Sequence, residues 1–267
     1  VLFGVQSVMM KEDSLTGMYY DYAMLAPVMA DVEPDSSVLV MGMGTGTFAK
    51  QCMRYFDGIT VEGVEIDEKI TSLAKEYFDM PDTVDVVTYD GRAYLQAVDK
   101  KYDVIMVDAY QDITIPFQMS SVEFFTMVRE HLKEDGVMVV NMNMHSKEDG
   151  NINDYLSDTI ATVFPYVYTV DVSGSTNREL FAGGNENMLK TAEENITKLA
   201  QIELAEMLDD AFKGLKPYEK GSYLLTDDKA PVELLGMQVI DGLIQSEIGY
   251  YKEIFKEEGI EGLLNSM

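Results

Sequence analysis

The stretch Val38-Leu-Val-Met-Gly-Met-Gly-Thr-Gly46 decides the fold that this sequence predicts. Its first part, residues 38–43, is almost entirely apolar, as expected for a strand that is buried on both faces of a parallel sheet. Three glycines follow within five residues, and glycine lets the backbone turn sharply and approach a ligand closely. A helix predicted at residues 45–56 would begin here and offer the N–H groups of its first turn. The stretch therefore predicts a strand, a ligand-binding turn and a helix.

Strands and helices alternate from this stretch onward. Apolar strand patterns occur at residues 38–43, 60–65, 84–89, 102–107, 136–142, 166–172 and 179–182. Helical patterns occur between them, at residues 45–56, 67–78, 91–98, 120–132 and 153–164. This alternation predicts an α/β class, Rossmann-like fold with a seven-stranded, mostly parallel sheet. A short Gly-Ser-Thr-Asn turn precedes the last strand. Because this turn is too short to contain a crossover helix, we expect the last strand to be antiparallel to the one before it.

Three parts are expected along the chain. Residues 1–35 form an N-terminal segment with a strand near residues 1–9 and a helix at residues 17–31. Residues 36–185 form the nucleoside-binding Rossmann-like domain. Residues 186–267 form a helical C-terminal extension that packs on this domain, with helices at 188–208, 231–245 and 247–264.

Composition narrows the class of function. The net charge of −27 argues against a nucleic-acid partner, because phosphates would be repelled, and suits a small cationic amine. Solubility alone would also account for acidic residues that are spread over the whole chain. One cysteine and two histidines leave no zinc-binding set, so no metal is expected. The single cysteine suits a reducing compartment, and no apolar run is long enough to span a membrane, so we expect a soluble, cytoplasmic chain.

Acidic residues follow three of the predicted strands, at the edge where an open α/β sheet binds its ligands. Glu65 closes the second strand, where a carboxylate can accept both ribose hydroxyls of a nucleoside. Asp90, followed by Gly91, comes after the third strand and could contact an adenine amino group or cap the next helix. Asp108 comes after the fourth strand, where it could orient an amine or take its proton.

The glycine loop itself favours a nucleoside over a dinucleotide. A dinucleotide fingerprint, G-x-G-x-x-G, would need glycine at Thr47, and this chain instead has G-x-G-x-G from Gly42 to Gly46. By itself this motif is also compatible with a purely structural turn.

Taken together, these stretches resemble the spermidine synthase family, which has an S-adenosylmethionine-methyltransferase fold. The resemblance covers residues 3–183 and a tail motif at residues 225–233. The segments at residues 108–110, 115–117 and 123–125, and the tail motif, are most similar to the spermidine-synthase-like domains that are fused behind membrane-spanning segments in bacteria. The family resemblance also makes residues 1–35 the remnant of an N-terminal hairpin domain.

The resemblance implies transfer of an aminopropyl group from decarboxylated S-adenosylmethionine to a diamine such as putrescine. Asp108 would be the catalytic residue that deprotonates and positions the attacking amine. The implied cofactor-binding residues are Gln6, Gly42, Gly44, Thr45, Gly46, Glu65, Ile66, Asp90 and Gly91. The implied substrate-binding residues are Tyr20, Asp108, Tyr110 and Asp112. The resemblance also implies a homodimer and a tether to a membrane segment outside this chain.

Two departures from the family pattern leave other functions open. Thr45 stands where the family has an aspartate that contacts the amino group of the cofactor. Gln111 stands where the family has its second acid, and Asp112 comes one residue later. The alternatives are a methyltransferase that uses S-adenosylmethionine on a small nucleophile, and a non-catalytic, regulatory nucleoside-binding domain.

Overall fold

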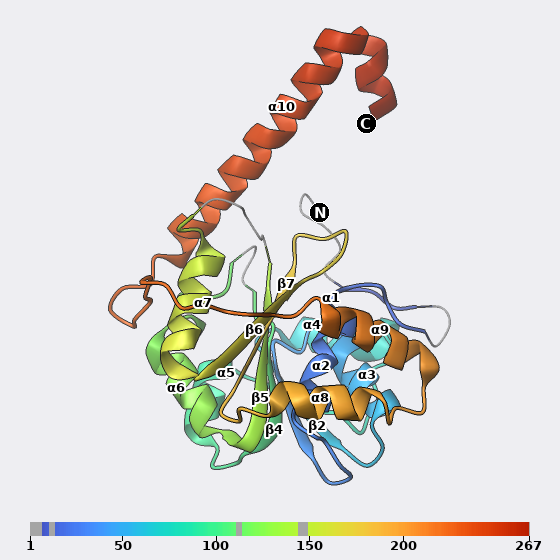
Figure 1. Ribbon diagram of the computed structural model, residues 1–267, viewed down its shortest axis with the longest axis vertical. Helices are drawn as coiled ribbons and strands as arrows, with labels where there is room; N and C mark the ends of the chain where they lie inside the picture. The colour runs from blue at the N-terminus through green and yellow to red at the C-terminus, as the bar shows by residue number, and fades with distance from the viewer. Residues whose placement is uncertain (1–6, 11–13, 111–113, 144–148, 267) are drawn as a thin grey trace.

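The computed structural model describes residues 7–10, 14–110, 114–143 and 149–266, which fold around one mixed β-sheet. The strands lie in the order β3-β2-β1-β4-β5-β7-β6-β8, with helices on both faces (Figure 1). Their bounds are β1 Ser37–Met41, β2 Thr60–Glu65, β3 Asp85–Thr88, β4 Tyr102–Val107, β5 Leu132–Met142, β6 Tyr166–Asp171, β7 Arg178–Gly183 and β8 Lys216–Pro217.

The strand order reverses between β1 and β4. The chain moves outward from β1 to β2 and β3, then returns to place β4 on the other side of β1. Helices that leave these two neighbouring strands go in opposite directions, which opens a crevice beyond the carboxyl ends of the strands. This is the edge of the sheet where the sequence places its acidic residues.

The predicted fold class is confirmed, with one correction. Strands β1 to β5 pair in parallel, and β7 pairs antiparallel with both β5 and β6. The sheet has eight strands and not the predicted seven, because β8 pairs with Tyr168 and Thr169 of β6. A two-residue strand has no alternation that a sequence pattern could reveal.

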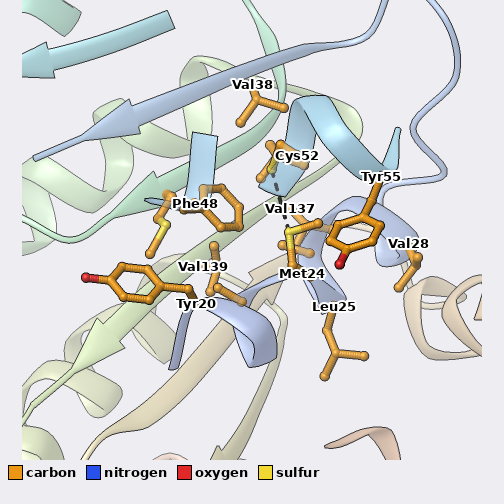
Figure 2. Close-up of a cluster of buried hydrophobic side chains, with 14 of the residues drawn as sticks. Tyr20, Met24, Leu25, Val28, Val38, Phe48, Cys52, Tyr55, Val137 and Val139 are labelled. Carbon is orange, nitrogen blue, oxygen red and sulfur yellow. Dashed lines mark hydrogen bonds between the residues drawn. The ribbon is translucent and has the colours of Figure 1, made fainter. Parts of the chain in front are cut away.

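Two apolar clusters cover the two faces of the sheet. One face packs against helices α1 Tyr19–Ala23, α2 Leu25–Met29, α3 Thr47–Tyr55, α8 Met188–Ile196 and α9 Ile202–Lys213. The other face packs against α5 Gly91–Ala97, α6 Val122–Glu130, α7 Ile152–Val163 and the start of α10 Val232–Ser266. Helix α4 Glu68–Tyr77 lies beside β2 and β3. Figure 2 shows part of the first cluster, where the sulfur of the buried Cys52 lies 3.8 Å from that of Met24.

The helix predicted at residues 17–31 is two short helices that meet at Met24. Pro27 explains the break, since proline has no N–H to donate to the carbonyl group of Ala23. The helix predicted at residues 188–208 is likewise divided into α8 and α9. The strand expected near residues 1–9 falls mostly outside the described part of the chain, and residues 7–10 carry no strand.

The C-terminal helices differ in how closely they pack. Helices α8 and α9 lie against α1 and α2. The region predicted to form two helices after residue 230 is α10, in which a kink at the non-helical Gly259 separates a long first helix from a short second one, so the break comes later than predicted. Its first turns bury Val232, Leu235 and Val239, and the rest extends away from the core (Figure 1). The division into three parts stays a prediction. None of the helices, within the residues that the structure describes, is both long enough and apolar enough to cross a membrane.

Candidate active site

A cavity of about 550 Å³ opens beyond the carboxyl ends of the strands. Its wall is formed by the loops after β1, β2, β3 and β4, the end of β5, the turn between β6 and β7, and helix α1. The predicted site residues that line it are Tyr20, Gly42, Gly44, Glu65, Ile66, Asp90, Gly91, Asp108 and Tyr110. The cavity therefore lies at the reversal of strand order and collects most of the predicted site.

Four predicted site residues are not among the described residues that line this wall. Gln6 and Asp112 lie outside the described residues. The Thr45 side chain is buried, and its hydroxyl oxygen has no hydrogen-bond partner within the part of the chain that the structure describes. Gly46 faces the protein interior, because a Cβ added there would lie 2.8 Å from the sulfur of Met80. Gly46 thus packs against Met80 beneath the loop, and neither Thr45 nor Gly46 is among the residues that line the cavity, so their ligand contacts stay predictions.

Glu65 links the glycine loop to the cavity. One carboxylate oxygen, Oε2, accepts a hydrogen bond from the Gly44 N–H at 2.9 Å, and the other, Oε1, accepts one from the Asp67 N–H at 3.1 Å. The residue is 7% exposed and lines the cavity wall. Each carboxylate oxygen has a second lone pair. Glu65 is therefore held rigidly and can still accept two hydroxyl groups, such as those of a ribose.

Gly42 and Gly44 are glycines for different reasons. Both have positive φ, +84° at Gly42 and +55° at Gly44. A Cβ at Gly42 would lie 2.5 Å from the carbonyl oxygen of Asp108, so this residue lets the loop pack against the backbone that follows β4. A Cβ at Gly44 would meet no atom within 4 Å, and Gly44 lines the cavity. The absence of a side chain at Gly44 leaves space for a ligand to lie against the backbone.

Asp90 combines the two roles considered for it. Its Oδ1 accepts a hydrogen bond from the Ala93 N–H at 2.8 Å and so caps helix α5. The same residue and the neighbouring Gly91 line the cavity, close to the end of β3. The helix cap fixes the position of a carboxylate that faces the ligand space.

Asp108 lies at the centre of a hydrogen-bond chain. Its Oδ2 accepts a hydrogen bond from the Tyr19 hydroxyl at 2.7 Å, and its Oδ1 accepts one from the Asn141 side-chain amide at 2.8 Å. The Asn141 Oδ1 in turn accepts a hydrogen bond from the Asn177 Nδ2 at 2.7 Å. Residues from α1, β5 and the β6–β7 turn thus orient one carboxylate.

Burial decides the protonation of Asp108. It raises the pKa of this carboxyl to about 7, although the hydrogen bonds from Tyr19 and Asn141 act in the opposite direction. Burial and the nearby Asp108 also raise the pKa of Tyr19 well above its usual range, so Tyr19 stays a hydrogen-bond donor. A carboxyl with a pKa near neutrality is suited to take a proton from a bound group.

Tyrosines form the wall next to Asp108. The Tyr110 hydroxyl donates to the carbonyl oxygen of Asn141 and accepts a hydrogen bond from the Asn143 N–H at 2.9 Å. Its hydroxyl therefore holds the end of β5, and its ring is left to contact a ligand. Tyr20 places its ring in the apolar cluster, and its hydroxyl points away from Cys52 and Met24 (Figure 2).

Sequence reasoning missed Tyr19, Asn141 and Asn177. Asn141 lies near the end of the fifth predicted strand, so the rule that ligands lie beyond strand ends could have found it. Tyr19 precedes Tyr20 directly, and no pattern in the sequence shows which of the two donates to Asp108.

The tail motif at residues 225–233 supports the cavity from outside. The carboxylate of Asp227 forms two hydrogen bonds with the Arg92 guanidinium, at 2.7 and 2.6 Å, and Arg92 also donates to the carbonyl oxygen of Gln118 at 3.0 Å. Gln118 lines the cavity. The hydrogen bond from Arg92 holds the pKa of Asp227 below its usual range. The tail thus fixes a wall of the site although it lies far away in the sequence.

A family model described as "Spermine/spermidine synthase domain" matches residues 18–179, which is more than half of the chain. The chain belongs to the spermine/spermidine synthase family. The resemblance predicted from the sequence is confirmed. The matched range contains Tyr19 and Asp108, and it ends on Glu179 of β7.

The name of one similar protein agrees with this family assignment. A protein of Bifidobacterium longum named "Probable polyamine aminopropyl transferase" is 54% identical over 284 residues; the match covers 100% of this chain and 63% of that protein. The chain thus spans less than two thirds of the length of this relative.

Solved structures share the fold. A spermidine synthase in complex with the transition-state analogue AdoDATO has a TM-score of 0.61 at 23% identity, with 73% of this chain and 72% of that chain covered. Human methyltransferase-like protein 13 in complex with SAH has a TM-score of 0.55 at 22% identity, with 79% and 96% covered. The spermine/spermidine synthase domain described here therefore has the methyltransferase-type fold that the sequence predicts.

The site offers no obvious place for a metal ion. Within the described ranges, no three His, Cys, Asp or Glu side chains are grouped so that they could hold one. His131 is not among the residues that line the cavity, and its ring nitrogens lie within hydrogen-bond distance of the carbonyl oxygens of Met127 and Val98. His145 lies outside the described residues.

Proposed function

We propose that this chain is a polyamine aminopropyltransferase, which transfers an aminopropyl group from decarboxylated S-adenosylmethionine to a small diamine such as putrescine. The observation that carries the proposal is the half-buried, oriented Asp108 in the same cavity as Glu65 and the glycine loop. Membership of the spermine/spermidine synthase family and the name of the Bifidobacterium longum relative support it.

The cavity residues fit the nucleoside part of the donor. Glu65 has lone pairs for the two ribose hydroxyls, Asp90 faces the same space, and Gly44 leaves room against the backbone. Such contacts are shared by S-adenosylmethionine and its decarboxylated form. The complexes with AdoDATO and SAH formed by the two proteins of like fold agree with a ligand of this type.

Asp108 would activate the acceptor. The bound donor supplies a carbon made electrophilic by its sulfonium sulfur. Aliphatic amines, like the lysine side chain, are protonated at neutral pH. The ionised Asp108 carboxylate would take one proton from the amine, so that the nitrogen lone pair can attack this carbon as its bond to sulfur breaks. The hydrogen bonds from Tyr19 and Asn141 hold the carboxylate in place during this step. Positioning of the two reactants would provide much of the acceleration.

The test is a pair of assays with purified protein. With decarboxylated S-adenosylmethionine and a diamine, we expect an aminopropylated amine detected by mass spectrometry, together with methylthioadenosine. Asp108→Asn should abolish this product and leave nucleoside affinity within a few fold. A methylated amine formed from S-adenosylmethionine, with no aminopropyl transfer, would refute the proposal in favour of a methyltransferase. Nucleoside binding without either product would support a regulatory binding domain.

Two associations implied by the family resemblance stay proposals. One is a homodimer, which sedimentation at several protein concentrations would test. The other is a tether to a membrane segment outside this chain. A cytoplasmic location follows from neither and also stays a prediction.

A further inference from the structure

Glu179 of β7 is a buried acid that the mechanism above does not use. Its exposed fraction is 0%, and neither carboxyl oxygen has a hydrogen-bond partner in the part of the chain that the structure describes. A buried polar group without a partner is costly, and few native groups are left in this state. The position of Glu179 shows where a partner could come from.

Glu179 lies directly behind the wall of the cavity. It is the cross-strand partner of Asn141 in β5, so the two side chains lie on the same face of the sheet, with Cβ atoms about 5 Å apart. Asn177, two residues earlier in the chain, lies on this face as well. Asn141 and Asn177 both line the cavity and are hydrogen-bonded to each other. This pair of amides therefore connects the position of Glu179 to the wall of the ligand space.

Among the residues that the structure describes, no cation contributes to the electrostatic environment of this acid. Its neighbours are Asp108 and Tyr110, which follow β4, and helix α1, which packs over this part of β7 and carries Tyr19 and Tyr20. The preceding residue, Arg178, pairs with Asp171. Burial, together with the charge of Asp108, raises the pKa of Glu179 well above its usual range. This environment favours the uncharged form of the carboxyl, whereas a positive charge close to it would favour the ionised form.

We propose that Glu179 determines the amine specificity of this pocket: its unpartnered carboxyl, next to Asp108 and behind the Asn141–Asn177 pair, is the counter-charge for the second ammonium group of a diamine. This inference rests on the proposed function. Asp108 serves the ammonium group that reacts, and Glu179 favours acceptors that carry another. The second acid that the sequence lacks at Gln111 is thus provided from a different strand.

The substitution Glu179→Gln tests the proposal, because glutamine keeps the volume of the side chain and removes its ionisation. The measured quantity is the ratio of kcat/KM for 1,4-diaminobutane to kcat/KM for butylamine. Glu179→Gln should lower this ratio by about tenfold or more, since a charge pair in a partly dry site is weakly screened. Glu186→Gln is the matched control, because it removes an exposed carboxylate shortly after β7 and should leave the ratio unchanged.

Calorimetry provides a reading that needs no turnover. Titration of each amine into protein saturated with methylthioadenosine, in two buffers of different ionisation enthalpy, gives affinity and the number of protons released. The wild type should bind the diamine more tightly than butylamine and release more protons with it than Glu179→Gln does. Near-equal ratios, affinities and proton counts for the wild type and Glu179→Gln would overturn the inference and make Glu179 structural only.

The two proposals can fail separately. If the wild type transfers an aminopropyl group but Glu179→Gln keeps the same diamine preference, only the role of Glu179 is wrong. If no aminopropyl transfer occurs but the calorimetric difference is present, the proposed reaction is wrong and Glu179 still selects diamines. A thermal melt of Glu179→Gln, expected at or above the wild-type Tm, shows that the variant is folded.

Discussion

Gly42 and Gly44 allow a sharp test, because the same substitution should have different effects two residues apart. Both residues have positive φ, where alanine costs roughly 1–2 kcal/mol relative to glycine. At Gly42 the added Cβ also lies 2.5 Å from the carbonyl oxygen of Asp108 and 2.7 Å from the Cα of Ala109. Both atoms belong to the backbone and cannot rotate away, so overpacking adds about 1–3 kcal/mol. Gly42→Ala should therefore lose about 2–5 kcal/mol of folding free energy.

Gly44→Ala should lose only the backbone contribution of about 1–2 kcal/mol, since no atom lies within 4 Å of the added Cβ. Its main effect should appear in binding. The added methyl group would lie in the cavity, next to the hydrogen bond from the Gly44 N–H to Glu65. Nucleoside affinity should therefore fall by about tenfold or more, while the protein stays folded.

The assay is urea denaturation followed by circular dichroism, with linear extrapolation of the unfolding free energy. Calorimetric titration with methylthioadenosine measures the binding effect. Two results would refute the reasoning. Equal loss of stability in both variants would show that the contact of Gly42 with the backbone after β4 does not exist. Wild-type nucleoside affinity in Gly44→Ala would show that the ligand does not approach this part of the loop.

Three further predictions follow from the site. Because the pKa of Asp108 is raised to about 7, kcat/KM should rise with pH through an apparent pKa near 7 as this carboxyl ionises; a limb near 4 in the pH profile would contradict the assignment. Asn141→Ala should lower kcat by about tenfold or more and leave nucleoside affinity unchanged, because it removes a hydrogen bond to Asp108; equal effects on both would indicate a general disturbance of the pocket. Because the pKa of Glu179 is raised in the folded state, the folded protein keeps a proton that the unfolded chain releases above about pH 4, so stability falls as pH rises through this range. Glu179→Gln should remove this fall, and its gain in unfolding free energy should be larger at pH 8 than at pH 4.5.

The fold could be predicted because its determinants are local. Residues 38–46 combine an apolar strand with the glycines of a turn, and strands with similar patterns recur at regular intervals. Features that depend on contacts between distant segments were not predictable in this way. The division of the first helix at Met24 is different, because it depends on Pro27, which is a local signal. The two-residue strand β8 exists only because β6 provides an edge for it to pair with.

The residues of the candidate site also divide into those that the local sequence predicts and those that it does not. Glu65, Asp90 and Asp108 follow strands directly, and parallel strands bring their ends to one edge, so adjacency in the sequence is enough to place them together. Gly46 shares the motif of Gly42 and Gly44, yet it faces Met80, and this difference depends on the direction of the backbone at each residue.

Asn177 and Glu179 are the clearest examples of residues near the site whose position the sequence pattern does not predict. Both belong to the part of the chain that reverses direction at the β6–β7 turn, and the register of β7 against β5 decides which side chains meet Asn141. A shift of this register by one residue would place Arg178, in place of Glu179, on the face of the sheet that carries Asn141. It would thereby bring a cation next to Asp108. The charge of the side chains next to Asp108 therefore depends on a strand register that the sequence pattern does not specify. The proposed selection of diamines depends on the same register, so measuring the diamine preference of Glu179→Gln tests the pairing of β5 with β7 as well as the chemistry.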